Sequence, residues 1–293
     1  MGWIAWILAS AFFLALYDLA KKASVRDNAV LPVLLCSTAC GSLAFVAGLA
    51  VSGGFAAAVA SVTPRVVALA ASKSVIVAAS WVFTFRALRT LPITVATPIR
   101  ASSPALVFVA AFFLYGERPS LMQGLGMLLV FAGYWTFSWA GRHEGIDFLR
   151  DRAVWCAIAG ACLSALSGVW DKYVFQVAGA PVEGVQLLFQ FGLIAVYAAL
   201  VAFGRVLGVT GPKFAWRWTI PFVGILLAVA DWLYFTGLAV PDAPISIASL
   251  MRRFSVAITF VLGAFCFRER NLRRKGLALA LVLAGISILC LCG

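Results

Sequence analysis

The sequence predicts an all-α integral membrane protein of ten transmembrane helices, arranged as two inverted five-helix repeats. Three observations predict this fold class: an apolar composition, apolar stretches of membrane-spanning length, and an internal repeat. Of the 293 residues, 63% are hydrophobic and only 12% are charged, and the mean hydropathy is +1.02. Soluble domains are about 45–50% apolar and about 25% charged. A soluble enzyme, a disordered chain, a collagen-like chain and a disulfide scaffold are therefore excluded.

The apolar stretches have the length that a membrane requires. A hydrocarbon core of about 30 Å needs roughly 20 apolar residues per helix, and helices are expected because lipid offers the backbone no hydrogen-bond partner. The stretches lie at 2–20, 29–52, 65–86, 92–115, 121–140, 153–175, 184–205, 218–240, 244–267 and 275–292. Pro92 and Pro244 begin the fourth and ninth stretches, the position in a helix where a missing N–H costs nothing.

An internal repeat divides the chain in two. Residues 83–133 align without a gap with residues 235–285. Identical pairs include Phe83/Phe235, Thr84/Thr236, Pro92/Pro244, Ala96/Ala248, Arg100/Arg252, Ser103/Ser255, Phe108/Phe260, Glu117/Glu269, Arg118/Arg270, Gly124/Gly276 and Gly133/Gly285. We expect a first repeat at 1–140, a connecting loop at 141–152 and a second repeat at 153–293. Because five is odd, the second repeat enters the membrane inverted, an architecture of many secondary transporters with the substrate between the halves.

Loop charges predict the orientation. The loops after the odd-numbered helices carry Lys21, Lys22, Arg26, Arg86, Arg89, Arg142, Arg150, Arg152, Arg205, Lys213, Arg217, Arg268, Arg270, Arg273, Arg274 and Lys275. The opposite face carries only Arg65, Arg118 and Lys172. By the positive-inside rule the first set is cytoplasmic, which places both termini outside a bacterial plasma (inner) membrane. The net charge of +12 is thus a topology signal, and no nucleic-acid partner is expected.

Motifs of enzymes and metal sites are not expected in this chain. The seven cysteines show no zinc or redox spacing and read as small buried hydrophobes. The single histidine, His143, lies in a loop, and no HExxH or GxSxG motif occurs. We therefore expect no enzyme activity, no metal and no cofactor.

Several motifs resemble the EamA family of the drug/metabolite transporter superfamily. They are Pro92-Ile-Thr-Val-Ala-Thr-Pro-Ile-Arg-Ala-Ser-Ser-Pro, Gly116-Glu117-Arg118, Gly124, Phe267-Arg268-Glu269-Arg270 and Gly276. The resemblance implies ten helices in two repeats and secondary transport, often export, of amino acids, other small metabolites or drugs. Small multidrug-resistance relatives use a glutamate in the first helix, whereas here the stretch Ala11–Ala15 has no acid and Asp18 lies near the helix end.

Four basic residues lie within predicted spans: Lys73, Arg100, Arg252 and Arg253. Each such charge costs on the order of 2.5–3.5 kcal/mol, so it needs a partner or a watery cavity. The clearest acid at that depth is Asp231, which leaves a surplus of positive charge. Asp18 and Asp171 lie near predicted helix ends, where we expect them to snorkel to the interface.

Arg100 and Arg252 are equivalent in the two repeats, and the inverted symmetry would bring them to one central site. Guanidinium groups pair with carboxylate or phosphate through two hydrogen bonds. We hypothesise that these arginines bind an anionic or zwitterionic substrate; the alternative is that they only hold the halves together. Candidate neighbours in the binding cavity are Ser103, Ser249, Trp81 and Trp232, for which helix packing and interface anchoring are the competing interpretations.

Three further questions stay open at this stage. Asp231 is either a proton carrier or the counter-ion of Lys73, Arg252 or Arg253. Small residues in 121–140 and 275–292 make a close helix contact either within the chain or in a homodimer. Glu117-Arg118 and Glu269-Arg270 are either turn and topology determinants or parts of a gate.

The function predicted from these features is secondary transport of a small molecule, an amino acid or an organic anion, by alternating access. The alternative is a flippase for a lipid or a lipid-linked headgroup, which would use the same arginines to hold a phosphate.

Overall fold

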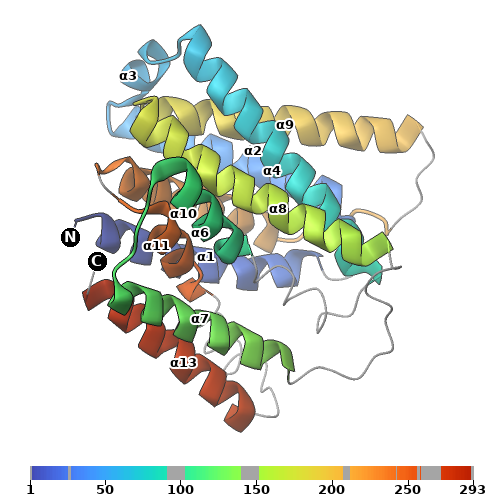
Figure 1. Ribbon diagram of the computed structural model, residues 1–293. Helices are drawn as coiled ribbons and strands as arrows, with labels where there is room; N and C mark the ends of the chain where they lie inside the picture. Colours follow the sequence, from blue (N-terminus) through green and yellow to red (C-terminus); the bar gives the residue numbers. More distant parts are fainter. Residues whose placement is uncertain are drawn as a thin grey trace.

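The computed structural model describes residues 2–25, 28–90, 103–139, 152–206, 212–241, 243–255, 258 and 272–291. Within this part of the chain the regular structure is helical, as the sequence predicts, and contains no strand. The helices are α1 (Gly2–Val25), α2 (Val30–Val51), α3 (Phe55–Ala60), α4 (Pro64–Thr90), α6 (Ser103–Tyr115), α7 (Leu121–Trp139), α8 (Arg152–Lys172), the π-helical turn η1 (Tyr173–Val177), α9 (Val182–Val206), α10 (Thr219–Ala239), α11 (Ile245–Arg252) and α13 (Leu272–Leu291) (Figure 1).

Among the described residues, six helices are long and apolar enough to cross a membrane. They are Gly2–Val25, Val30–Val51, Pro64–Thr84, Arg152–Val177, Val182–Gly204 and Thr219–Ala239. Two shorter apolar helices, Ser103–Tyr115 and Leu121–Gly133, accompany them. The protein is therefore a multi-pass membrane protein. The predicted spans 92–115 and 244–267 fall partly outside the described residues.

Local signals in the sequence start and stop these helices. Thr63 caps α4 by accepting the N–H of Val66 at 3.3 Å. At the start of α7, Ser120 and Gln123 exchange hydrogen bonds of 2.8 and 3.2 Å, which is a capping box. Gly116 has a φ of 65°, a conformation that glycine adopts without strain, and it ends α6 so that the chain turns directly into Glu117.

Among the described helices, every extensive interface joins one half of the chain to the other. We call α1 to α7 the first half and α8 to α13 the second half. The pairs are α1 with α10, α4 with α8, α2 with α10, α4 with α9, α2 with α9, and α7 with α13. The offset of the sequence repeat pairs α1 with α8, α2 with α9, α4 with α10 and α7 with α13. When each helix is exchanged for its counterpart, the pattern of interfaces is unchanged. Figure 1 shows that the counterparts α1 and α8 run in opposite directions through the bundle.

Two of these interfaces are backbone contacts between glycines. A Cβ atom on Gly41 of α2 would overlap the carbonyl oxygen of Gly224 in α10. A Cβ atom on Gly126 of α7 would lie 2.9 Å from the carbonyl oxygen of Gly285 in α13. Small residues permit such approaches. The sequence leaves open whether the small residues of 121–140 and 275–292 meet within one chain or in a homodimer. In the structure α7 and α13 make this contact within one chain.

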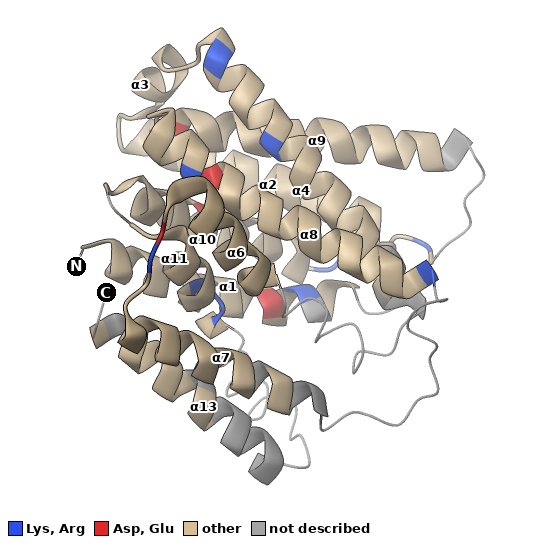
Figure 2. Cartoon of the chain, in the orientation of Figure 1, with Lys and Arg blue, Asp and Glu red and all other residues tan. Residues whose placement is uncertain are grey.

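Charged residues are few along the described helices, and most of the ribbon carries none (Figure 2). Several of them gather where α8, α10, α11 and the α6–α7 connection meet. An isolated charge at membrane depth is costly. These charges therefore need partners or water, and their arrangement defines the candidate functional site.

Candidate functional site

A buried ion pair joins the two halves. Lys73 of α4 and Asp171 of α8 form a salt bridge, with side chains only 3% and 5% exposed. The Lys73 ammonium also lies 4.7 Å from the ring centre of Phe189 and 4.6 Å from that of Phe235. Aromatic faces attract cations at such distances. Lys73 is thus held by one carboxylate and two rings in a dry environment.

The expected position of Asp171 was wrong. The sequence predicts this residue near a helix end, from which it would reach the interface. In the structure α8 continues into η1 as far as Val177, with the Ala178 N–H bonded to the Tyr173 carbonyl at 2.7 Å. Asp171 is therefore more than a turn inside the helical segment, and it points at Lys73 because α4 packs against α8.

A second ion pair lies beside the first. Arg252, the last residue of α11, pairs with Asp231 of α10, and the two side chains are 21% and 16% exposed. The Arg252 guanidinium lies 4.2 Å from the ring centre of Tyr234. Its Nε is buried and has no hydrogen-bond partner. This arginine therefore keeps one donor that its carboxylate does not use.

The two pairs interact as one electrostatic cluster. Asp171 interacts with Arg252 and Asp231 as well as with Lys73. The Tyr234 ring, which lies at Arg252, has its centre 5.8 Å from that of Phe235, the ring that lies at Lys73. Within the two pairs the formal charges cancel. With Asp231 as the one clear acid, the sequence predicts a surplus of positive charge within the spans. That surplus is smaller in the structure, because Asp171 neutralises Lys73.

The other predicted site residues have varied surroundings. Ser103 is buried at the start of α6, and the Ser249 hydroxyl donates to the Ser246 carbonyl at 3.0 Å. Trp81 lies under the Lys21 ammonium at 4.2 Å. Arg100 lies outside the described residues, as do Glu269 and Arg270.

Trp232 packs edge-on against Trp6 of α1, with ring centres 6.0 Å apart. The rings that contact the ion pairs are instead Phe189, Phe235 and Tyr234. The sequence does not indicate a role for Phe189, because an isolated aromatic residue in an apolar stretch cannot be distinguished from one that faces lipid.

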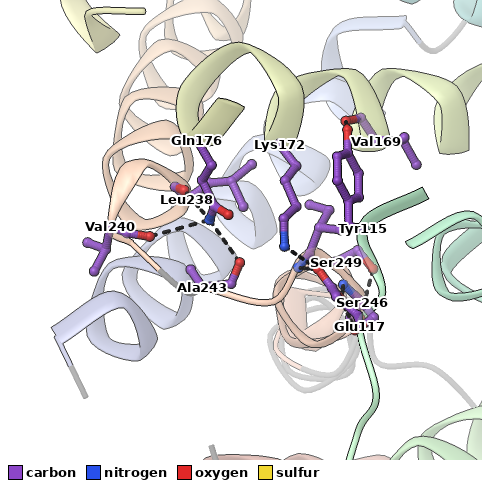
Figure 3. Close-up of polar contacts among 11 residues, drawn as sticks. Tyr115, Glu117, Val169, Lys172, Gln176, Leu238, Val240, Ala243, Ser246 and Ser249 are labelled. Atoms are coloured by element: carbon purple, nitrogen blue, oxygen red, sulfur yellow. Dashed lines mark hydrogen bonds and ion pairs between the residues drawn. The ribbon is translucent and has the colours of Figure 1, made fainter. Parts of the chain in front are cut away.

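A polar cluster occupies the end of the bundle where α6 and α8 finish (Figure 3). The Glu117 carboxylate accepts hydrogen bonds from the backbone N–H groups of Ile245 and Ser246 at 2.8 and 3.0 Å. It also accepts the Ser246 hydroxyl and the Lys172 ammonium, the latter at 2.6 Å. A cavity of about 180 Å³ adjoins it, lined by Glu117, Arg118, Pro119, Gln123, Pro244, Ser246 and Ile247.

Metal ligands do not cluster in the described part of the chain, where no group of three or more His, Cys, Asp or Glu side chains occurs. The polar groups of both clusters are ammonium, guanidinium, carboxylate and hydroxyl groups. Such groups recognise charged organic molecules through hydrogen bonds and ion pairs.

Comparison with known proteins identifies the first half. Residues 1–139 match the EamA-like transporter family, which confirms the resemblance that the motifs at 92–124 indicate for the first half. Curated proteins include no match to the chain. One crystal structure of a protein is 17% identical to this chain, with a TM-score of 0.78, and the alignment covers 100% of this chain and 99% of that chain. At this identity the likeness shows a shared fold and nothing about activity.

Proposed function

We propose that this chain, whose residues 1–139 match the EamA-like transporter family, is a secondary transporter. Its substrate would be a small metabolite, either an amino acid or an organic anion. The observation that carries the proposal is the pair of neighbouring ion pairs inside an otherwise apolar bundle. Lys73 comes from the first half and Asp171, Asp231 and Arg252 from the second. Ionisable groups at such positions mark substrate or ion pathways in membrane proteins.

The balance of charge favours a zwitterion over a strongly charged anion. The two pairs already cancel, and adding net charge to a poorly solvated cluster is costly. A molecule with one carboxylate and one ammonium can bind Arg252 and Asp231 in place of their mutual contact. The buried rings of Tyr234 and Phe235, 3% and 1% exposed, would adjoin its apolar part. An α-amino acid fits this chemistry, and the family resemblance favours its export.

The transport cycle would be an alternating-access exchange between two inverted five-helix halves. Two observations support that architecture. The helix interfaces keep their pattern when each helix is exchanged for its counterpart, and the counterparts α1 and α8 run in opposite directions. The start of α1 and the end of α13 also lie at one end of the bundle (Figure 1), as an even number of crossings requires.

Ligand-induced stabilisation of the purified protein tests the proposal. A ligand at about 100 times its dissociation constant stabilises a protein by about 2.7 kcal/mol. The panel comprises amino acids, organic acids, phosphorylated headgroups and organic cations, applied to wild type, Arg100→Gln/Arg252→Gln and the matched control Arg65→Gln. Arg65 is exposed at the start of α4, so its loss removes a positive charge away from the cluster.

We expect stabilisation by an amino acid in the wild type and in the control, and its loss in the double variant. Stabilisation by phosphorylated headgroups alone would favour the flippase. Stabilisation by cations alone, unchanged in the double variant, would remove the arginines from the site. A pH gradient imposed across vesicles tests the proton-carrier interpretation of Asp231, which indifference to the gradient would eliminate.

A further inference from the structure

The N-terminus of α11 has no cap from its own sequence. Pro244 occupies the N-cap position and forms no side-chain cap. The first N–H groups of any helix need acceptors from elsewhere, and a negative charge is favourable there. Glu117 supplies both from the α6–α7 connection, by accepting the N–H groups of Ile245 and Ser246. The first half of the chain therefore caps a helix of the second half.

The carboxylate of Glu117 is fully engaged. Its side chain is 8% exposed, and it bonds the two N–H groups, the Ser246 hydroxyl and the Lys172 ammonium. Lys172 in turn lies 5.1 Å from the ring centre of Tyr115. Charge-assisted hydrogen bonds of this kind are about twice as strong as neutral ones. Glu117 thus links the first half to both α8 and α11 of the second half at this end.

The chain that leads into α11 is held as well. The side-chain amide of Gln176 in η1 donates to the carbonyls of Leu238, Val240 and Ala243 at 2.9, 3.3 and 2.9 Å (Figure 3). Gln176 and Lys172 are four residues apart, so they lie on one face of the helical segment. Gln176 therefore holds the connection between α10 and α11 directly, while Lys172 on the same face holds Glu117.

Helix α11 transmits this constraint to the central cluster. It has only eight residues, Ile245 to Arg252. Glu117 binds its first turn, and Asp231 binds Arg252 at its last residue. A shift of α11 at either polar anchor must therefore move the other.

We propose that Glu117 is a positioning residue and a latch: it sets the position of Arg252 through α11, and it releases α11 when this end of the bundle opens. The inference rests on the proposed transport function for its role in a cycle. The contact suits a latch because it crosses between the halves, consists of polar groups that water can replace, and adjoins the cavity of about 180 Å³.

Cysteine labelling tests the latch without any substrate. In a background with the seven cysteines replaced, Ser103→Cys places an isosteric thiol at a position that is 3% exposed. A membrane-impermeant maleimide is applied from the side of the α6–α7 connection. Glu117→Gln keeps the shape of the side chain and removes its charge. We expect labelling to become about tenfold faster or more, because a charge-assisted contact of the closed state is lost.

The matched control is Glu183→Gln. Glu183 is also an acid in the first turn of a helix, but the helix, α9, is in its own half of the chain. We expect its loss to leave labelling unchanged. Should Glu117→Gln not fold, Ser246→Ala removes one hydrogen bond of the same carboxylate and should give a smaller increase. Equal labelling of wild type and a folded Glu117 or Ser246 variant overturns the latch.

The positioning role has a separate readout. Pro244→Asp, added to Glu117→Gln, gives α11 a cap of its own but cannot restore the link between the halves. We expect this second change to recover ligand stabilisation of the purified protein while Ser103→Cys stays rapidly labelled. If ligand stabilisation does not recover, Glu117 does not act through α11; if labelling returns to the wild-type rate as well, the link between the halves is not the latch. If no ligand stabilises even the wild type, the proposed function fails, while the labelling result still decides the latch.

Discussion

The two central ion pairs differ in what surrounds them. Lys73 and Asp171 are 3% and 5% exposed, and aromatic rings cover the ammonium. Arg252 and Asp231 are 21% and 16% exposed, and the arginine retains an unpartnered Nε. A buried pair is costly to separate, whereas a more solvated one exchanges partners more readily. This difference favours a structural role for the first pair and, under the proposed function, ligand exchange for the second.

The largest effect should come from breaking the drier pair. Lys73→Met leaves the Asp171 carboxylate buried without its cation, which typically costs about 3–5 kcal/mol. Lys73→Met/Asp171→Leu should recover much of the loss, because it removes both charges. Thermal unfolding of the purified variants measures the difference. A single variant as stable as the wild type would contradict the structural role.

Arg252→Gln should separate binding from stability. We expect at least tenfold weaker binding of the transported ligand, with a smaller loss of stability than for Lys73→Met, since this pair is more exposed. Arg252→Lys keeps the charge but not the planar fork of donors, so its binding should be intermediate. A larger stability loss in Arg252→Gln than in Lys73→Met would reverse the comparison.

A smaller effect is expected at Tyr234. Its ring lies under the Arg252 guanidinium at 4.2 Å, and a cation–π contact contributes about 0.5–2 kcal/mol. Tyr234→Leu should therefore weaken ligand binding severalfold and lower the thermal midpoint slightly. Tyr234→Phe, which retains the ring, is the control and should bind like the wild type. Equal binding by the leucine variant would show that the ring does not help to hold the arginine.

The smallest effect is that of salt. Raising the ionic strength from about 0.01 M to about 1 M shortens the Debye length from about 30 Å to about 3 Å. Ligand binding at Arg252 should weaken with salt, because that pair is partly solvated. The stability difference between wild type and Lys73→Met should stay constant, because their difference lies in a dry pair. A difference that shrinks with salt would place Lys73 in a wetter environment.

Sequence reasoning found the charges that stand out within an apolar stretch. Lys73, Asp231 and Arg252 were visible because any ionisable residue at membrane depth needs an explanation. Asp171 was misplaced because the predicted span ended soon after it. Its partner approaches from another helix of the other half, and no local pattern in the sequence records that packing.

The role of Glu117 was also only partly predictable from the sequence. The Glu-Arg motif was recognised, with topology and gating as alternatives, but its acceptor role depends on Ile245, which is 128 positions away in the chain. Gln176 was not considered at all, because a single amide gives no periodic signal. Its contacts arise where η1 brings it under the carbonyls that end α10. Local chemistry was predictable here, and the pairing of distant segments was not.

The cross-half packing has a consequence for how the protein is made. Helices emerge from the ribosome in order, and in the described part of the chain the main partners of α1, α2, α4 and α7 are α8, α9, α10 and α13. The helices of the first half are therefore inserted before their packing partners have been synthesised. The glycine face of α7 is covered when α13 is inserted. A nascent chain halted near residue 139 should be handed to quality-control proteases, so synthesis of the second half acts as the folding step of the first.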